Sequence, residues 1–405
     1  MEGGGLHFTL LTHSSKDTEY KSSYFNQTMR YCTFSESELE DCIHLDPEMS
    51  EFQGLLVKDI PIQYGVFSVG GTLFMFGGCR LEDDPIAPEP TNWLWSVSPL
   101  SPPPPHAASP NMCWTRCPTA MNVKRYTSVL VPLRDGRIFI CGGSRGTTDL
   151  ESWAEIYDPV KGQFEARKLS DDIGYPLPTS CFQWTDELVV IYYHRWFYSK
   201  ELFYRPSRDK LGEDKQHSKP SLLSYNLRTK EWEVIEEKLP GPLPTSDYRK
   251  KRNLVYVGCD TLFIIDSTSH WFSYNLSSKE LGKVKVEGQS KEYEDEDEEL
   301  VVGAVYAGNN VSQSTGWVIY IFQDNCETCL RYSKVEVVQW KGMDYVATVL
   351  SSGLVTVGFF TNVDIIVDRE MNNPAIGNGK HALLPKKQAR ESLLKEKGEE
   401  TIDDE

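Results

Sequence analysis

The sequence predicts an all-β fold in which four-stranded antiparallel sheets repeat around a ring, as the blades of a propeller. Three observations carry this expectation: short apolar runs that end in two glycines, tight-turn residues between such runs, and aromatic residues at a fixed spacing after them. Self-similar units of this size are typical of propellers and solenoids. Aromatic residues make up 12% of the chain, which supplies large apolar side chains to pack one unit on the next.

The clearest unit spans residues 124–167. RYTSVLV (125–131) and RIFICGG (137–143) are separated by an Arg-Asp-Gly turn, and an Asp-Gly pair favours a tight β-hairpin. WAEIYDP (153–159) follows a polar loop, and a second turn leads to the edge strand QFEAR (163–167). Four antiparallel strands in one short unit make the blade of a propeller.

Partial copies of this unit recur along the chain. GTLFMFGG (71–78) repeats the second strand with its glycine pair, and DELVVIYYH (186–194) has two tyrosines in place of the glycines. Residue pairs at the same spacing follow three of these strands: Tyr157 and Phe164, Tyr225 and Trp232, Tyr274 and Leu281. The remaining second-strand candidates are TLFIID (261–266), WVIYIFQ (317–323) and LVTVGFF (354–360). The pattern predicts six blades.

The two ends of the repeat region complement each other. YVATVLSSGLVTVGFF (345–360) supplies two strands without a following aromatic pair, whereas LHFTLLTH (6–13) and MRYCTF (29–34) lack a preceding glycine-pair hairpin. A blade built from both ends would remove an exposed sheet edge. We therefore predict a six-bladed propeller over residues 1–368 that strands of both termini close. A seventh blade made of residues 6–58 is the alternative.

Three stretches interrupt the pattern: a proline-rich one at 98–110, a charged one at 201–220 and an acidic one at 288–300. Runs of like charge favour a solvated insertion over the alternative, a docking loop for a basic partner. Residues 369–405 are rich in charge, and we expect a tail that is mostly flexible or forms one short helix.

These motifs resemble the kelch repeat, whose signature is an apolar strand, two glycines, a Tyr and a Trp about seven apart, and an Arg that opens the next blade. The resemblance covers about residues 6–365, is most specific at 124–167, and places Arg125 at the opening position. It implies a kelch-type β-propeller that acts as a non-catalytic protein-interaction platform. Because many kelch propellers are substrate receptors of ubiquitin ligases, it also implies a recognition or adaptor role in ubiquitin-linked regulation. The chain is similar to the plant F-box/kelch group, but strand-like sequence begins at Leu6, so we expect no F-box.

In kelch domains the partner meets the loops between blades and the loops after the glycine pair. Carried onto this sequence, that mouth holds cationic and aromatic residues: Arg80, Arg125, Arg145, His194, Arg195, Tyr248, Arg249 and Arg252. Arginine clusters recognise carboxylates through charge-assisted hydrogen bonds, so we predict an acidic peptide as the ligand. The alternative is that Arg125 pairs with a neighbouring blade while the other side chains face water.

A metal-dependent kelch enzyme is the alternative function. The galactose oxidases of this superfamily hold copper with tyrosines and histidines, and the iron-dependent specifier proteins use E-x-x-x-D-x-x-x-H. The eight histidines form no close pair, and Leu262 takes the Glu position of the iron motif before Asp266 and His270. Cys326 and Cys329 form a lone C-x-x-C, which lacks the four ligands of structural zinc. We predict no metal and no cofactor.

Charge and composition restrict the partners further. The formal net charge of −17 argues against general nucleic-acid binding, which needs a basic face. No apolar run is long enough to span a membrane, and the first residues lack a secretory signal. The ten cysteines show no disulfide framework, which fits a reducing compartment. We expect a protein of the cytosol or nucleus, and the sequence leaves its oligomeric state open.

Overall fold

The computed structural model describes the strands and their tight turns. The described residues are 6–15, 27–41, 44–47, 50–51, 64–69, 72–80, 89–97, 114–125, 128–143, 152–170, 173, 176–195, 220–236, 239, 253–265, 271–287, 301–309, 316–326, 328–357 and 362–369. Leu6–Asp368 form one compact unit. The predicted insertions at 98–110, 201–220 and 288–300 and the predicted tail 369–405 lie outside the described residues, except for Pro220 and Arg369, which belong to strands.

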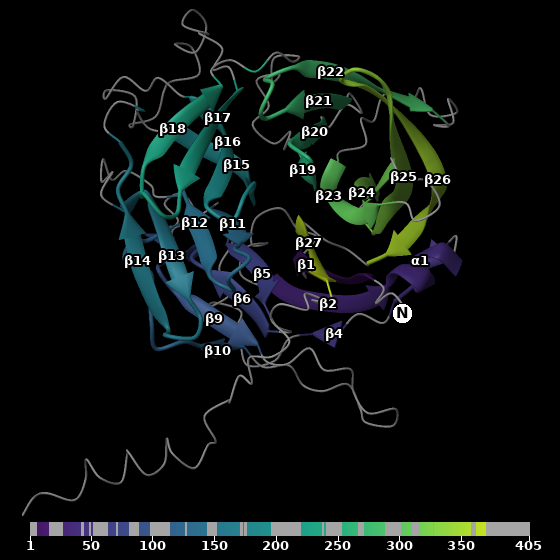
Figure 1. Cartoon of the computed structure of the whole chain (residues 1–405). Coiled ribbons are helices and arrows are strands. Elements are labelled where there is room, and N and C mark those ends of the chain that lie inside the picture. Colours follow the sequence, from purple (N-terminus) through teal and green to yellow (C-terminus); the bar gives the residue numbers. More distant parts are fainter. Residues whose placement is uncertain are drawn as a thin grey trace, which may run out of the picture. The chain divides into compact units, whose positions relative to one another are not determined.

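Three antiparallel four-stranded sheets make up the middle of the described chain (Figure 1). The first contains β5 (Gly65–Val69), β6 (Thr72–Phe76), β9 (Leu94–Val97) and β10 (Thr115–Arg116). The second contains β11 (Val129–Pro132), β12 (Ile138–Cys141), β13 (Ala154–Asp158) and β14 (Gln163–Arg167). The third contains β15 (Pro176–Gln183), β16 (Leu188–Arg195), β17 (Pro220–Asn226) and β18 (Trp232–Glu236). Their strands pair in chain order, as expected for kelch blades.

A nine-stranded sheet follows and joins two meanders of four strands. The first meander is β19 (Asn253–Gly258), β20 (Thr261–Ile265), β21 (Trp271–Asn275) and β22 (Leu281–Glu287). The second is β23 (Val301–Asn309), β24 (Gly316–Cys326), β25 (Cys329–Lys341) and β26 (Asp344–Thr356). β22 pairs in parallel with β26, and the short β3 (His44–Leu45) pairs in parallel further along β26. Because the two meanders share one sheet, the number of blades stays a prediction.

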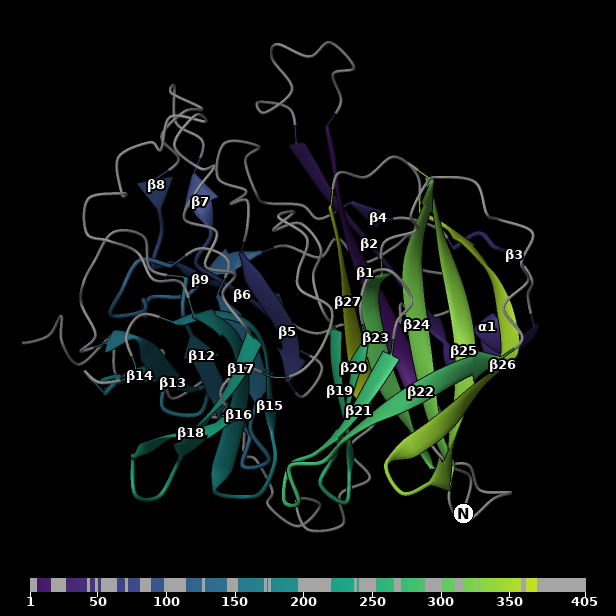
Figure 2. The same ribbon diagram turned by 90° about the horizontal axis from the view of Figure 1, so that it is seen from above.

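The prediction of two strands over residues 345–360 is wrong. Asp344–Thr356 form the single strand β26, which is among the longest strands in Figure 2. The register of β26 against β25 shifts beside Val335, where Leu350 has no partner on β25. A bulge of this kind absorbs an extra residue and lets the strand continue. LVTVGFF therefore begins inside the fourth strand of its meander and is not a second strand.

Both ends of the repeat region meet in one sheet, as predicted, but the C-terminal strand is Asn362–Arg369 and not the predicted stretch 345–360. Its order is β27 (Asn362–Arg369), β1 (Leu6–Ser15), β2 (Gln27–Ser35) and β4 (Ser50–Glu51). The short helix α1 (Glu36–Asp41) follows β2. Ser35 and Glu38 form a capping box at its start: the Ser35 backbone N–H donates to Glu38 Oε2 at 2.6 Å, and the Glu38 N–H donates to Ser35 Oγ at 3.3 Å.

Buried clusters of apolar side chains connect neighbouring strand groups. One cluster lies between the sheets β5–β10 and β11–β14, and the next lies between β11–β14 and β15–β18. Two more lie between β15–β18 and the meander β19–β22, and between the meanders β19–β22 and β23–β26. The β1–β2 hairpin packs on β24–β26 through Phe8 and on the sheet of β6 and β9 through Leu11. The chain of packing contacts therefore returns to its starting point, so each sheet is buried on two sides, as in a propeller.

The aromatic pairs at the repeat spacing are cross-strand partners, as their role as wedges requires. Tyr157 lies opposite Phe164, with ring centroids 4.6 Å apart, and Tyr225 lies opposite Trp232 at 4.4 Å. Both pairs touch the preceding sheet. Phe76 contacts Tyr157 at 5.8 Å, and further ring contacts join Phe139 to Tyr225 and Trp153 to Trp232. The prediction that these residues pack one unit on the next is confirmed.

Candidate binding site

The antiparallel sheets have two distinct ends. One end carries the tight turns between first and second strands and between third and fourth strands; the opposite end carries the connections that follow the glycine pairs. Turns of successive sheets contact each other. Arg134 Nη1 donates to Asp186 Oδ1 at 2.5 Å, and Trp184 Nε1 donates to Asp260 Oδ1 at 2.7 Å. We call this the hairpin-turn end and the opposite one the glycine-pair end.

The glycine pairs have the conformation that the sequence predicts. Gly77, Gly78, Gly142 and Gly143 all have positive φ, between 60° and 90°, a region that side chains with a Cβ rarely adopt. The backbone also approaches closely here: a Cβ on Gly77 would lie 2.4 Å from the carbonyl oxygen of Arg125. That carbonyl accepts a hydrogen bond from the N–H of Gly78 at 2.7 Å. The glycines are scaffold residues.

Arg125 is fully buried beside both glycine pairs. Its Nε donates to Glu155 Oε1 at 3.0 Å, and Nη2 lies 3.0 Å from the same oxygen. Its Nη1 donates to the carbonyls of Gly142 and Trp153 at 2.6 and 2.9 Å, and Nη2 also donates to the carbonyl of Ser152. A guanidinium carries its N–H donors on three nitrogens, and these contacts engage all three.

Glu155 is equally buried and equally well paired. Its second oxygen, Oε2, accepts hydrogen bonds from the backbone N–H and the side-chain Nδ2 of Asn122, both at 2.8 Å. A buried ion pair is favourable only where its remaining donors and acceptors find partners, and here they do. The Arg125–Glu155 pair, with Asn122, is a structural lock between the sheets of β5–β10 and β11–β14.

The ligand-binding role predicted for Arg125 is therefore replaced by a structural one. The guanidinium is inaccessible to a ligand, and each of its nitrogens already contacts Glu155 or a backbone carbonyl. The alternative expected from the sequence, pairing of Arg125 with a neighbouring blade, holds only for its backbone, which bonds Gly78 and Thr91 of the preceding sheet. The side chain pairs within the unit that Arg125 opens. The lock fixes the backbone at both glycine pairs, where the loops of the predicted binding site begin.

The other predicted mouth residues are placed only in part. Arg80 ends the two-residue strand β7 (Cys79–Arg80), opposite Glu89 in β8 (Glu89–Pro90). His194 and Arg195 end β16 at the glycine-pair end. The side chains of these three residues lie outside the described part of the chain, as do Arg145, Tyr248, Arg249 and Arg252 entirely. The mouth residues other than Arg125 remain predictions.

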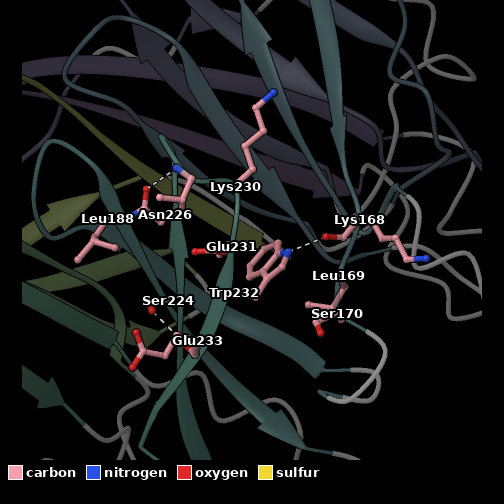
Figure 3. Close-up of a pocket in the computed structure, with 11 residues that line it drawn as sticks. Lys168, Leu169, Ser170, Leu188, Ser224, Asn226, Lys230, Glu231, Trp232 and Glu233 are labelled. Atoms are coloured by element: carbon pink, nitrogen blue, oxygen red, sulfur yellow. Dashed lines mark hydrogen bonds between the residues drawn. The ribbon is translucent and has the colours of Figure 1, made fainter.

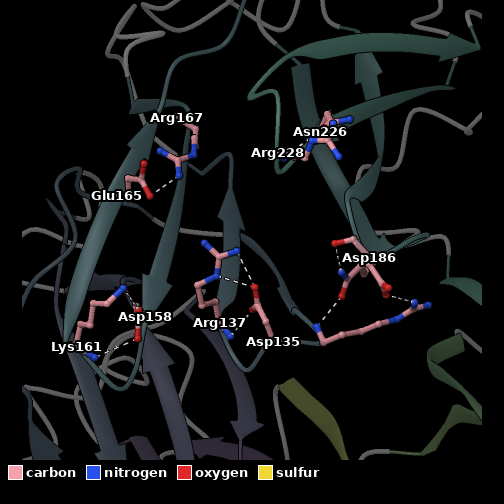
Figure 4. A network of polar contacts seen from close by, with 11 residues as sticks. Asp135, Arg137, Asp158, Lys161, Glu165, Arg167, Asp186, Asn226 and Arg228 are labelled. Atoms are coloured by element: carbon pink, nitrogen blue, oxygen red, sulfur yellow. Dashed lines mark hydrogen bonds and ion pairs between the residues drawn. The ribbon is translucent and has the colours of Figure 1, made fainter. Parts of the chain in front are cut away.

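The hairpin-turn end carries arginines and lysines that pair with carboxylates (Figure 4). The pairs are Arg134 with Asp186, Arg137 with Asp135, Lys161 with Asp158, and Arg228 with Glu187. Towards the outer strands, Glu165 accepts from both Arg167 and Lys230. The hydrogen bond from Arg167 and then that from Lys230 lower the pKa of Glu165 to about 2, against the opposing effect of burial. The arginines and lysines at this end are therefore already paired with carboxylates of the same chain.

A groove of about 620 Å³ lies beside the β17–β18 hairpin (Figure 3). Trp232 crosses it: its Nε1 donates to the carbonyl of Lys168 at 2.6 Å and so ties β18 to the chain that follows β14. The lining is polar around this ring, with residues 168–170 on one side and the turn residues 229–231 and Glu233 on the other.

Sequence reasoning missed both Glu155 and this groove. Glu155 had a signal, because it is the one charged residue within the otherwise apolar start of WAEIYDP, and a buried charge needs a partner. Trp232 was predicted only as a packing residue. The alternation of Glu231, Trp232 and Glu233 signals an edge strand with one exposed face.

Comparison with known proteins identifies one repeat directly. The kelch motif model matches residues 127–166, which cover the sheet β11–β14. No curated protein matches the chain. The matched motif shows a kelch repeat at residues 127–166, and the four-stranded antiparallel sheets are those of a β-propeller. Kelch repeats generally mediate protein interactions. Within the described residues, no group of three or more metal-ligating side chains gathers, and no helix is long and apolar enough to cross a membrane.

Proposed function

We propose that this protein is a non-catalytic interaction platform that binds an acidic segment of a partner protein at its glycine-pair end. The observation that carries the proposal is the Arg125–Glu155 lock. It holds Gly78 through the Arg125 carbonyl, and Gly142 through the Arg125 side chain. Arg80 and Arg145 follow these glycine pairs by two residues each, so their loops start from a rigid base. Rigid support of binding loops lowers the entropy lost on binding.

The charge distribution supports this end over the other. At the hairpin-turn end, Arg134, Arg137 and Arg228 already face carboxylates of their own chain, so an acidic ligand would have to compete with them. The chain as a whole carries a formal charge of −17, which repels an acidic ligand from most of its surface. Binding of an acidic peptide therefore requires a local cluster of cations. The predicted mouth offers arginines, together with His194, for that role.

The biological setting that we propose follows the kelch resemblance. As a recognition or adaptor subunit in ubiquitin-linked regulation, the platform would present a bound protein to another component. The cytosol or nucleus is the setting we propose, which the free buried thiols of Cys32 and Cys141 support, because thiols persist in reducing compartments.

Charge reversal at the mouth tests the proposal. We expect the variant Arg80→Glu/Arg145→Glu to bind a fluorescein-labelled peptide of twelve acidic and glycine residues on the order of a hundredfold more weakly than wild type. Two desolvated charge-assisted hydrogen bonds of about 1.5 kcal/mol each account for that factor. Fluorescence anisotropy titration measures it.

The matched control is Arg134→Glu/Arg228→Glu, which changes the net charge by the same amount at the hairpin-turn end. These arginines are 56% and 77% exposed, so we expect their replacement to weaken binding by less than about threefold, through screened long-range repulsion alone. Equal weakening by both variants would show that net charge, not the mouth, governs binding, and would contradict the proposal.

A further inference from the structure

β18 is the outermost strand of its sheet, and its outer side has no strand partner among the described residues. The N–H of Asn226 donates to the carbonyl of Glu231 at 2.9 Å, so the carbonyl of Glu231 points toward β17. Backbone N–H and C=O groups of successive residues point to alternate sides of an antiparallel strand. The backbone groups of Glu233 therefore point toward β17, whereas those of Trp232 and Val234 point to the outer side of β18. β18 therefore offers backbone donors and acceptors at an edge.

The same protein shows how an edge in this position accepts a strand. β22 is the fourth strand of its meander, as β18 is of its own, and β26 lies on the outer side of β22 in parallel. Val284 faces Tyr345 and Val286 faces Ala347, and these side chains join one apolar cluster. The added strand alternates, with Tyr345 and Ala347 buried and Thr348 exposed. β18 lacks such a cover in the described chain and has the groove beside Trp232 instead.

The two sides of β18 differ in chemistry. Trp232 and Val234 pack toward the sheet β11–β14, on the side where Leu169 and Ser170 line the groove. Glu231 and Glu233 alternate with them, are exposed, and line the same groove, which Lys168 and Lys230 also line. Opposite charges that face each other across two strands are stabilising. An added strand therefore fits best when its apolar side chains lie beside Trp232 and Val234 and its basic side chains lie beside the two glutamates.

We propose that β18 is a second docking site, which binds an extended peptide of alternating apolar and basic residues by strand addition. This site is separate from the glycine-pair end and selects the opposite charge, so it does not depend on the function proposed above. Strand addition supplies affinity through main-chain hydrogen bonds and specificity through alternate side chains. The net charge of −17 favours encounter with a basic segment.

Two comparisons test the site with the full chain. The probe is a fluorescein-labelled seven-residue peptide that alternates lysine and valine. We expect the same peptide with N-methyl groups on all interior residues to bind at least about tenfold more weakly, because it keeps the charge but loses its main-chain donors. We expect the variant Glu231→Lys/Glu233→Lys to weaken binding of the unmodified peptide by about tenfold or more, because two attractive cross-strand pairs become repulsive.

The matched control is Glu280→Lys/Glu287→Lys. Glu280 holds the place in the β21–β22 hairpin that Glu231 holds here, since its carbonyl accepts from the N–H of Asn275 at 2.9 Å. Both control glutamates are exposed, and β26 already covers their strand. We expect affinity within about twofold of wild type for the control. Equal weakening by the two variants, or unchanged binding of the N-methylated peptide, overturns the proposal. So does a dimer in solution that excludes the peptide, because the edge would then belong to a second copy of this chain.

Discussion

Replacement of Arg125 by methionine lowers the free energy of unfolding by about 3–5 kcal/mol, because Glu155 then stays buried without its cation. Both side chains have no exposed surface, so water cannot take the place of the missing guanidinium. The carbonyls of Gly142, Ser152 and Trp153 lose their donors in the same step. Urea unfolding followed by tryptophan fluorescence measures the change.

Companion variants separate the lock from a general loss of charge. In Arg228→Met, an arginine that is 77% exposed loses its pair with Glu187, and we expect a change of less than about 1 kcal/mol. Arg125→Lys should recover only part of the stability, because an ammonium group has three donors and not five. In Arg125→Met/Glu155→Met both charges are gone, and much of the loss should be reversed. A single Arg125→Met variant within 1 kcal/mol of wild type would refute the lock.

Replacement of Trp153 by alanine is the second large effect, and we expect a loss of about 3–5 kcal/mol. Trp153 is fully buried in the cluster between the sheets of β11–β14 and β15–β18. Its ring meets that of Trp232 edge-on at 5.3 Å between centroids. Truncation removes this contact and leaves a cavity that the two rigid sheets cannot close.

Trp340 provides a matched control of the same residue type. Its side chain is 74% exposed near the end of β25, so Trp340→Ala should change the free energy of unfolding by less than about 0.5 kcal/mol. Thermal or urea unfolding of the two variants side by side makes the comparison. Similar losses for both variants would contradict the placement of Trp153 in the shared core.

Local patterns in the sequence were sufficient for much of the fold. The glycine pairs, the Asp-Gly turn at Gly136 and the spacing of Tyr157 from Phe164 each follow from neighbouring residues, and the structure confirms each. A sheet shared by both ends was also predictable, because neither end of the repeat region makes a whole sheet alone, but the strand Asn362–Arg369 that joins β1 was not predicted. LVTVGFF was misassigned because a short apolar run has no period that separates a second strand from a fourth one.

The candidate site was less predictable, because its contacts join residues that are distant in the sequence. Arg125 meets Glu155 thirty residues later and a carbonyl at Gly142 seventeen residues later. No local spacing reveals such partners. The motif therefore singled out Arg125 correctly as a special residue but not its role. The β18 groove depends in the same way on residues 168–170, which reach Trp232 only when two sheets pack together.

Hydrogen exchange in the presence and absence of the acidic peptide tests the central claim most directly, namely that a partner binds at the glycine-pair end on loops anchored by the Arg125–Glu155 lock. We predict slower exchange in segments 79–92 and 144–152, which follow the two glycine pairs. The turns at 133–137, 158–162 and 226–231 should be unchanged. Protection that is confined to those turns, with none after the glycine pairs, would contradict the claim.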